Sequence, residues 1–580
     1  MSAAEEVLLD LNVLAEGQTF FAVGPSAVSD DGRLLAYRMD VVGYRQFTLA
    51  IKDLQTAAVL SERIERVTGV VWAVDNRTVF YVTEDPVTKR SDKLFRHMVG
   101  TDAHDLVYEE QNDLFSLGVT RSRDKAMIFV MAHSMTSTEV RYIDATRPDA
   151  VAALVVAREP DHEYAVGHRN GLFYIRTNKG ATNFRVVTAP VGDPSEGRWT
   201  ELVPHRPGVK IDRIDVFADH LVQSCWEEGL QQLEVMSLAT RDTHRVVFPE
   251  PVYAVFPVSN AEFDVTVVRY QYQSLVTPPS VFDYDMNTRQ ATLLKEMEVP
   301  GGFDRADHTS ERIAATAADG TRVPISLVYS SGVRLDGSAP LLLSGYGSYG
   351  ISMSPVFSSA RLALLDRGVI CAIAHVRGGE ELGEDWRERG RMMEKMNTFT
   401  DFITCAEHLL VRRYTSSSRL AIQRGSAGGL LVGVVTNMRP SLFKAAIAQV
   451  PFVDVINTML DASLPLTTGE YIEWGNPNEQ SAFDYIMQYS PYDNVRQQEY
   501  PAMLIKVSLN DSQVPYWEGA KLVAKLRDFK TDQNPLLLKV NFGAGHGGSS
   551  GRYEAMRELA FDYAFVLWQL GLAESGTVAG

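Results

Sequence analysis

The pattern of hydrophobic and polar positions divides the chain near residue 300. Before that point, short segments in which apolar and polar residues alternate are separated by turn-forming residues, as at residues 34–37, 47–51, 70–74 and 78–82. Alternation with a period of two, bounded by Gly, Asn and Asp, is typical of β-strands. The strands group into about six similar units, near residues 25–55, 68–102, 114–148, 163–191, 211–242 and 251–295. Such repeats favour a β-propeller, with a pair of β-sandwiches as the alternative.

The pattern changes after residue 302. An Asp319-Gly320 hairpin turn is followed by apolar runs at residues 340–343, 369–374, 420–422, 445–448, 502–507 and 536–540. Segments with helical periodicity separate these runs, and residues 553–572 read as a closing helix. Buried strands alternating with helices indicate a mostly parallel, doubly wound sheet. The pattern therefore predicts a propeller domain over residues 1–302 and an α/β domain over residues 303–580.

One serine lies in a run of small residues between a predicted strand and a predicted helix. Residues 425–429 read GSAGG, with Ser426 second in the run. In an α/β-hydrolase, such a tight turn presents a serine Oγ as a nucleophile. Arg424, however, stands where the Gly-x-Ser-x-Gly pattern has its first glycine, so an ordinary strand-to-helix turn is the alternative for this stretch alone.

Two further residues complete a possible catalytic triad. Asp511 follows the predicted strand at residues 502–507, and His546 follows the strand at residues 536–540. In α/β-hydrolases the triad appears in the order Ser, Asp, His, and the loops after parallel strands meet at one edge of the sheet. We therefore predict Ser426 as the nucleophile, His546 as the general base and acid, and Asp511 as the group that orients the imidazole.

Two donors are candidates for an oxyanion hole. The N–H of Ala427 lies at the predicted N-terminus of the helix after Ser426. Tyr346 follows the first apolar strand of the α/β domain, so its hydroxyl could be the second donor; a buried structural tyrosine is the alternative.

Net charge, cysteine content and the absence of certain motifs bear on which partners the protein binds. A net charge of −17 disfavours nucleic-acid binding. Three scattered cysteines suggest a reducing compartment without a disulfide framework. The chain has no CxxC or HExxH motif, no basic-then-apolar leader and no apolar run of about 18 residues. We therefore expect a cytoplasmic protein with no metal, cofactor, nucleic-acid or membrane partner; the sequence leaves monomer or dimer open.

Several stretches together resemble the prolyl oligopeptidase family of serine peptidases, and within it the oligopeptidase B branch. They are SGYGSYG at 344–350, HVRGGEELG at 375–383, GSAGG at 425–429, VPFVDV at 450–455, LTTGEYIEWGNP at 466–477, YSPYDNV at 489–495 and GHGGSSGR at 545–552. The resemblance spans the chain. It implies a propeller lid on an α/β-hydrolase domain, cleavage of short peptides after Arg or Lys, and the roles given above to Ser426, Asp511, His546 and Tyr346.

The resemblance also implies substrate-binding residues. In oligopeptidase B two glutamates, two residues apart, bind the cationic P1 side chain; here Glu470 matches the first, and Ile472 occupies the second position. Glu473 lies beside it, but neighbours on an extended segment face opposite ways. Where the family has an arginine that holds a substrate carbonyl, this chain has Gln513.

Other departures from the family pattern lead to a competing hypothesis. Ser354 and Val356 replace the acidic pair that bacterial members use for a basic P2 residue. Family members begin with a segment that packs on the hydrolase domain and then a first blade; residues 6–10 resemble the last strand of that blade, so the propeller is expected to be truncated. The alternatives are therefore a weakened or truncated homologue that binds peptides without efficient hydrolysis, and an acylaminoacyl or prolyl peptidase.

Overall fold

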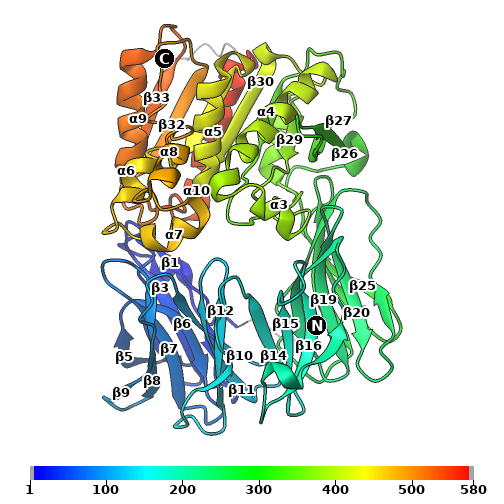
Figure 1. Cartoon of the computed structure of the whole chain (residues 1–580), viewed down its shortest axis with the longest axis vertical. Coiled ribbons are helices and arrows are strands. Elements are labelled where there is room, and N and C mark those ends of the chain that lie inside the picture. The colour runs from blue at the N-terminus through cyan, green and yellow to red at the C-terminus, as the bar shows by residue number, and fades with distance from the viewer. Residues whose placement is uncertain (1–5, 574–580) are drawn as a thin grey trace.

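The computed structural model describes residues 6–573, which form a β-sheet domain and an α/β domain stacked one above the other (Figure 1). The predicted fold class, a β-propeller with an α/β-hydrolase domain, is confirmed. The first sheet has five strands and the next five sheets have four each. Neighbouring strands pair antiparallel in every one of these sheets.

The six sheets follow one another along the chain. The first contains β1 (Ala22–Val23), β2 (Ala27–Val28), β3 (Leu34–Asp40), β4 (Thr48–Asp53) and β5 (Val59–Ile64). The second contains β6 (Val67–Trp72), β7 (Thr78–Glu84), β8 (Ser91–Met98) and β9 (His104–Glu109). The third contains β10 (Ser116–Arg121), β11 (Met127–His133), β12 (Thr138–Asp144) and β13 (Ala153–Val156). The fourth contains β14 (Tyr164–Arg169), β15 (Leu172–Thr177), β16 (Arg185–Pro190) and β17 (Thr200–Val203). The fifth contains β18 (Val209–Val216), β19 (His220–Glu227), β20 (Leu230–Ser237) and β21 (Thr243–Arg245), and the sixth β22 (Tyr253–Pro257), β23 (Val267–Ser274), β24 (Ser280–Asp285) and β25 (Gln290–Glu296).

Apolar clusters join each sheet to the next. One cluster spans the first and second sheets, and four others span each following pair up to the fifth and sixth. Within residues 6–573, no such cluster joins the sixth sheet to the first. Val252 and Leu275, which flank strands of the sixth sheet, pack instead against the α/β domain. The second to fifth sheets therefore carry apolar side chains on both faces, because each of them packs between two neighbouring sheets.

The start of the described chain differs from the expectation. Residues 6–10 form no strand, and a one-turn helix, α1 (Leu11–Leu14), follows them, capped by the side chain of Asp10. Leu9 packs against Leu35 and Tyr37 on the first sheet, and the Lys52 Nζ donates to the carbonyl of Leu8 at 2.7 Å. The segment therefore covers one face of the first sheet without pairing with its strands.

The α/β domain is built on an eight-stranded sheet with the order β26-β27-β29-β28-β30-β31-β32-β33. The strands are β26 (His308–Thr316), β27 (Arg322–Ser330), β28 (Leu341–Ser344), β29 (Ile370–Ala374), β30 (Leu420–Gly425), β31 (Ala445–Gln449), β32 (Ala502–Ser508) and β33 (Leu536–Asn541). The first two form the predicted hairpin, and the other six are parallel to one another. The predicted apolar runs coincide with these parallel strands.

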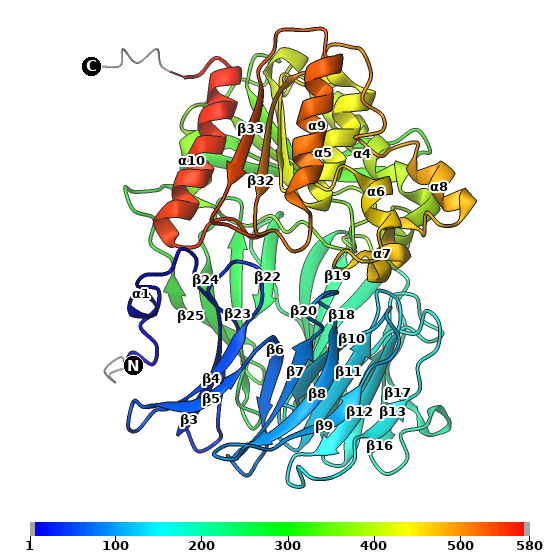
Figure 2. The same ribbon diagram turned by 90° about the vertical axis from the view of Figure 1, so that its left-hand side faces the viewer.

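Helices cover the two faces of this sheet unequally. One face packs against α4 (Met396–Val411), α5 (Ala427–Met438), α6 (Val455–Leu460) and α9 (Tyr516–Phe529). The other face packs against the short α2 (Leu362–Leu365) and the closing helix α10 (Arg552–Gln569). Figure 2 shows α9 and α10 on opposite sides of β32 and β33. The remaining helices are α3 (Glu384–Glu388), α7 (Thr467–Trp474) and α8 (Gln480–Ile486).

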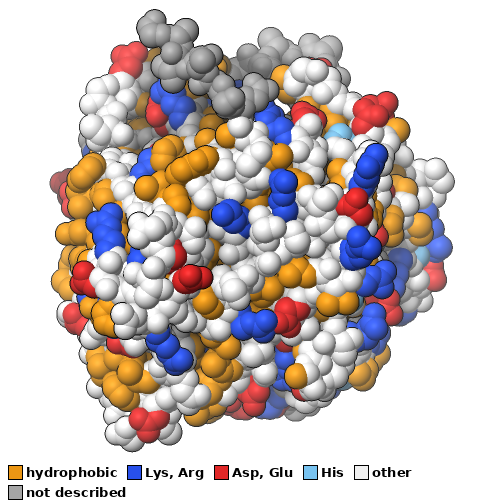
Figure 3. Space-filling view, turned by 90° about the horizontal axis from the view of Figure 1, so that it is seen from above, with side chains coloured by type: hydrophobic (Ala, Val, Ile, Leu, Met, Phe, Trp, Pro, Cys, Tyr) orange, Lys and Arg blue, Asp and Glu red, His pale blue; other side chains and the backbone are white. Residues whose placement is uncertain are grey.

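The outer surface of the α/β domain carries both signs of charge. Seen from above, Lys and Arg side chains are interspersed with Asp and Glu side chains, while hydrophobic side chains gather on one side of this face (Figure 3). The net charge of −17 is therefore not concentrated on this face.

Candidate active site

Ser426 lies at a strained turn between β30 and α5. Its φ of 60° and ψ of −131° place an L-residue in a region that favours glycine. The neighbouring glycines give the turn room: a Cβ on Gly428 would lie 2.0 Å from the Cγ of Arg424, and one on Gly429 would lie 2.6 Å from the Cβ of Pro451. The stem of Arg424 thus occupies space that Gly428 leaves open, so the elbow accommodates the arginine that departs from the glycine pattern.

The three predicted triad residues come together at the carboxyl edge of the sheet. The His546 Nε2 lies 3.0 Å from the Ser426 Oγ, and its Nδ1 lies 2.8 Å from the Asp511 Oδ2. The other carboxylate oxygen of Asp511 accepts hydrogen bonds from the backbone N–H groups of Gln513 and Val514, both at 2.9 Å. These bonds fix the buried carboxylate, so it faces the imidazole in one orientation.

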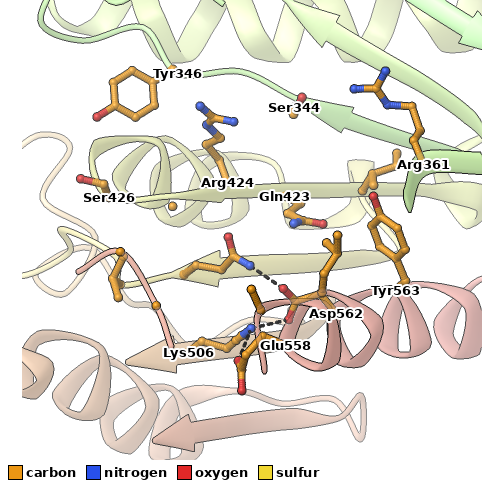
Figure 4. A pocket seen from close by; sticks show the side chains of 18 of the residues that line it. Ser344, Tyr346, Arg361, Gln423, Arg424, Ser426, Lys506, Glu558, Asp562 and Tyr563 are labelled. Atoms are coloured by element: carbon orange, nitrogen blue, oxygen red, sulfur yellow. Dashed lines mark hydrogen bonds and ion pairs between the residues drawn. The ribbon is translucent and has the colours of Figure 1, made fainter. Parts of the chain in front are cut away.

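The two predicted oxyanion donors lie beside Ser426. Ala427 is the first residue of α5, where a backbone N–H has no acceptor within the helix. Tyr346 follows β28, is 9% exposed, and points its phenol toward the side of Ser426 (Figure 4). Burial raises the pKa of Tyr346, while the Ser426 hydroxyl and the Arg424 cation act in the opposite direction. The phenol is therefore a neutral donor near neutral pH.

A cavity of about 720 Å³ lies between the two domains and reaches Ser426. We call it the front cavity. The α/β domain contributes Tyr346, Ser426, Phe452, Glu470, Gln513 and His546 to its wall, and the propeller contributes Arg90, Asp113, His133 and Met135. A substrate in this cavity would be enclosed by both domains.

Glu470 is an acidic side chain in the wall of the front cavity and belongs to helix α7. It accepts hydrogen bonds from the Tyr349 hydroxyl at 2.9 Å and from the Trp474 Nε1 at 2.7 Å. Burial raises the pKa of Glu470, and these two donors partly offset the rise. The expectation of an extended segment here is wrong, because the bond from Trp474 joins positions i and i+4, which face each other only on a helix.

Two family models match the chain. The model described as the prolyl oligopeptidase N-terminal beta-propeller domain matches residues 1–297, and the model described as the prolyl oligopeptidase family matches residues 355–573. The chain belongs to the prolyl oligopeptidase family. It is accordingly a serine-type peptidase.

Relatives place this family member near oligopeptidase B. The chain is 44% identical to dipeptidyl aminopeptidase BI of Pseudoxanthomonas mexicana, over 98% of this chain and 79% of the relative. It is 41% identical to protease 2 of Moraxella lacunata, over 98% of this chain and 83% of the relative. The structure of oligopeptidase B from Leishmania major superposes with a TM-score of 0.95 at 40% identity, covering 98% of this chain and 81% of the other. The predicted resemblance to the oligopeptidase B branch is thereby confirmed.

Glu473 lies away from the front cavity of this peptidase. It is 1% exposed, accepts the backbone N–H of Tyr349 at 2.9 Å, and lies 3.6 Å from the Nζ of Lys395. Lys395 is itself fully buried, and burial lowers its pKa to about 8. Glu473 is therefore engaged in an internal ion pair behind the cavity wall, whereas Glu470 and Gln513 both line the cavity.

The sequence did not indicate the propeller side of the front cavity. Arg90 and Asp113 form an ion pair at 3.4 Å, and His133 lies at the end of β11. These residues stand at unremarkable positions in strand-and-loop repeats, so no motif distinguished them. Only the packing of the two domains brings them opposite the triad.

Buried charges connect the propeller to the α/β domain on one side of the cleft. Lys210 of β18 pairs with Glu380 and with Glu384, the latter at 2.6 Å, and Arg387 of α3 lies 3.4 Å from Glu163 of the propeller. Burial raises the pKa of Glu380 and of Glu163. Glu380 and two residues of α3, Glu384 and Arg387, thus serve domain contact, a role that the sequence did not suggest.

A different contact lies next to the catalytic loops. The Asn510 Nδ2 donates to the carbonyl of Val42 at 3.1 Å, and a Cβ on Gly545 would lie 1.7 Å from the carbonyl oxygen of Gly43. Asn510 precedes Asp511, and Gly545 precedes His546. The loop after β3 in the first sheet therefore touches both loops that carry the base and its orienting acid.

Within the described chain, no group of three or more His, Cys, Asp or Glu side chains is arranged to hold a metal ion. No helix in residues 6–573 is both long and apolar enough to cross a membrane.

Proposed function

We propose that this prolyl oligopeptidase family member hydrolyses short peptides after Arg or Lys, with Ser426, His546 and Asp511 as its triad. The observation that carries the proposal is the position of His546, within hydrogen-bond distance of both the serine hydroxyl and the aspartate carboxylate. Such a chain of contacts allows the imidazole to accept the serine proton and then stabilises the resulting imidazolium.

The proposed reaction proceeds through an acyl-enzyme. The Ser426 Oγ attacks the scissile carbonyl while its proton passes to His546. The negative charge that develops on the carbonyl oxygen is stabilised by the Ala427 N–H and the Tyr346 hydroxyl. His546 then gives its proton to the leaving amine, and a water molecule releases the acyl group by the same steps in reverse. Asp511 keeps the imidazole in the required orientation throughout.

The preference for a cationic P1 side chain rests on Glu470. Its carboxylate lines the front cavity together with Ser426, and a buried guanidinium or ammonium requires a carboxylate partner. The name of the relative protease 2 and the structure of oligopeptidase B are consistent with peptide substrates. With Ile472 in place of a second glutamate and Glu473 paired internally, Glu470 would act as a single anionic anchor.

The hypothesis of a weakened homologue is not favoured. One of its motives, beside Ile472, Gln513 and the short N-terminal region, is Arg424, and the open space beside Gly428 receives that side chain. The enclosed front cavity supports a preference for short or unstructured peptides, since a folded protein could not enter between the domains.

Hydrolysis of a panel of fluorogenic amides tests the proposal. The panel contains arginyl, lysyl and prolyl amides and, because one relative is named a dipeptidyl aminopeptidase, dipeptidyl amides with free and blocked amino termini. We expect cleavage after Arg and Lys, and a fall of about 10⁴- to 10⁶-fold in Ser426→Ala. Ser418→Ala, which changes an exposed serine, is the matched control. Full activity of Ser426→Ala, or equal cleavage after Pro and Arg, would contradict the proposal.

A further inference from the structure

A second cavity, of about 660 Å³, lies on the opposite side of the catalytic elbow. We call it the rear cavity. It shares Tyr346, Ser426 and His546 with the front cavity. Part of its remaining wall comes from the sheet face that carries only α2 and α10, and the rest from Leu275 of the propeller and the loops after β28 and β33. Figure 4 shows side chains of the middle strands directed into this space.

The rear cavity contains a cation without a counter-ion. Among the described residues, the Arg424 guanidinium makes no ion pair and no hydrogen bond; its contact is with the Tyr346 ring, 5.3 Å from the centroid. The side chain is partly buried, and burial lowers the pKa of Arg424. A guanidinium is costly to desolvate unless an anion or several acceptors surround it.

Two more polar groups in this wall lack full partners. Arg361 donates to the carbonyl of Val356 at 3.0 Å but, within residues 6–573, forms no ion pair with a carboxylate. The Oε1 of Gln423 is buried and has no hydrogen-bond partner in the described chain. Figure 4 shows the Arg361 guanidinium directed toward Ser344 and Arg424, so the two cations border the same space.

The facing wall is internally neutralised. Lys506 lies 2.8 Å from Asp562 and 2.9 Å from Glu558, and Gln449 donates to Asp562. Lys539 pairs with Glu558 from the other side. These charges satisfy one another, so the uncompensated charge in the cavity is the positive charge of the two arginines.

The rest of the lining is partly polar, with Ser344, Ser354, Ser508 and Asn541, and partly apolar. Leu275, Val328, Leu342, Leu364 and Leu559 contribute hydrocarbon surface to the rear cavity. A free phosphate would leave this surface wetted, whereas an amphiphilic anion would cover it. We propose that the rear cavity binds an organic carboxylate with an apolar body, whose carboxylate group lies between the guanidinium groups of Arg424 and Arg361.

The proposal is tested with octanoate and octanamide, which share an apolar chain and differ in charge. Binding is measured by titration calorimetry on the Ser426→Ala protein, so the result does not depend on hydrolysis and its failure is distinct from failure of the proposed peptidase activity. We expect one octanoate per chain and at least tenfold weaker binding of octanamide. Equal affinity for the two compounds, or no binding of octanoate, would overturn the proposal.

Variants locate the site. Arg424→Met keeps an unbranched stem beside Gly428, and Arg361→Met acts on a residue that lines the rear cavity but not the front one. Each is expected to weaken octanoate binding at least tenfold, whereas Arg334→Met, at an exposed position, should leave it unchanged. Arg424→Lys, which retains the charge, should keep part of the affinity and serves if the methionine variant fails to fold. Unchanged binding in the folded Arg424 and Arg361 variants would place octanoate elsewhere and overturn the proposal.

Discussion

The front and rear cavities meet at Ser426, Tyr346 and His546 but carry opposite charge. The front cavity presents the carboxylate of Glu470, held by Tyr349 and Trp474. The rear cavity presents the guanidinium groups of Arg361 and Arg424. One catalytic elbow can therefore separate two binding environments of opposite charge, because Tyr346 and the turn at Ser426 lie between the two cavities.

Variants of the cavity residues are expected to fall into two kinds. A residue that both cavities share, or that supports a shared residue, should alter the hydrolysis of every substrate to the same extent. A residue of the front cavity alone should alter the hydrolysis of some substrates only.

The largest effect is expected for Asp511→Asn. The amide cannot accept the imidazole N–H in the same way, so His546 loses the tautomer that can take the serine proton. We expect kcat to fall by about 10⁴-fold for arginyl, lysyl and neutral amides alike. Steady-state kinetics on the three substrates measures it. A loss confined to arginyl amides would place Asp511 in substrate recognition and contradict its assignment to the triad.

The next effect is expected for Tyr346→Phe. Removing one oxyanion donor should lower kcat by about 10²- to 10³-fold, with little change in KM, because the hydroxyl acts on charge that develops in the transition state. Tyr349→Phe is a matched control, since its hydroxyl contacts Glu470 rather than Ser426. If Tyr349→Phe lowered kcat for neutral amides as strongly as Tyr346→Phe, the assignment of the oxyanion donor would be wrong.

A selective effect is expected for Glu470→Gln. The amide is nearly isosteric but neutral, so kcat/KM should fall by about 30-fold or more for arginyl amides, from the lost charge pair, and should change little for neutral amides. Glu479→Gln removes an exposed carboxylate nearby and should have no effect. An equal loss on both substrates would show that Glu470 supports the fold rather than the preference for a cation.

The pH dependence of KM for arginyl amides tests the role of Glu470 further. The ionised carboxylate binds the cation, and burial raises its pKa. On acidification Glu470 therefore becomes protonated at a higher pH than an exposed glutamate does, and KM for arginyl amides should rise there. Neutral amides report the titration of the triad alone, so the ratio of the two profiles isolates Glu470. The Glu470→Gln variant should lack this pH-dependent difference.

The smallest effect is expected for Gln513→Ala. Gln513 lines the front cavity, and its side chain can donate one neutral hydrogen bond to a substrate. Loss of such a bond is worth about 1 kcal/mol, or roughly fivefold in KM. Gln498→Ala, remote from the cavity, is the control. A change of more than a hundredfold would mean that the substitution disturbs the neighbouring backbone bonds to Asp511.

Local sequence predicted the α/β domain well, because short apolar runs alternate with segments of helical periodicity, as in a buried parallel sheet. The order Ser426, Asp511, His546, each after such a strand, also predicted which loops would meet. The local sequence did not show which charged side chains line the cavity and which are paired inside the domain. Glu470 and Glu473 are three residues apart, yet on helix α7 one lines the front cavity and the other pairs with Lys395.

The periodicity of the strands, the small residues of the elbow and the order of the catalytic side chains could all be read from the sequence. Those properties depend on neighbours along the chain. Only the tertiary structure decided that Gly428 makes room for Arg424, that the propeller loop at Gly43 touches Gly545, and that two arginines lack counter-ions behind the serine. These depend on distances between segments far apart in sequence, and the burial and pairing of a charge are set by such distances rather than by its neighbours in the chain.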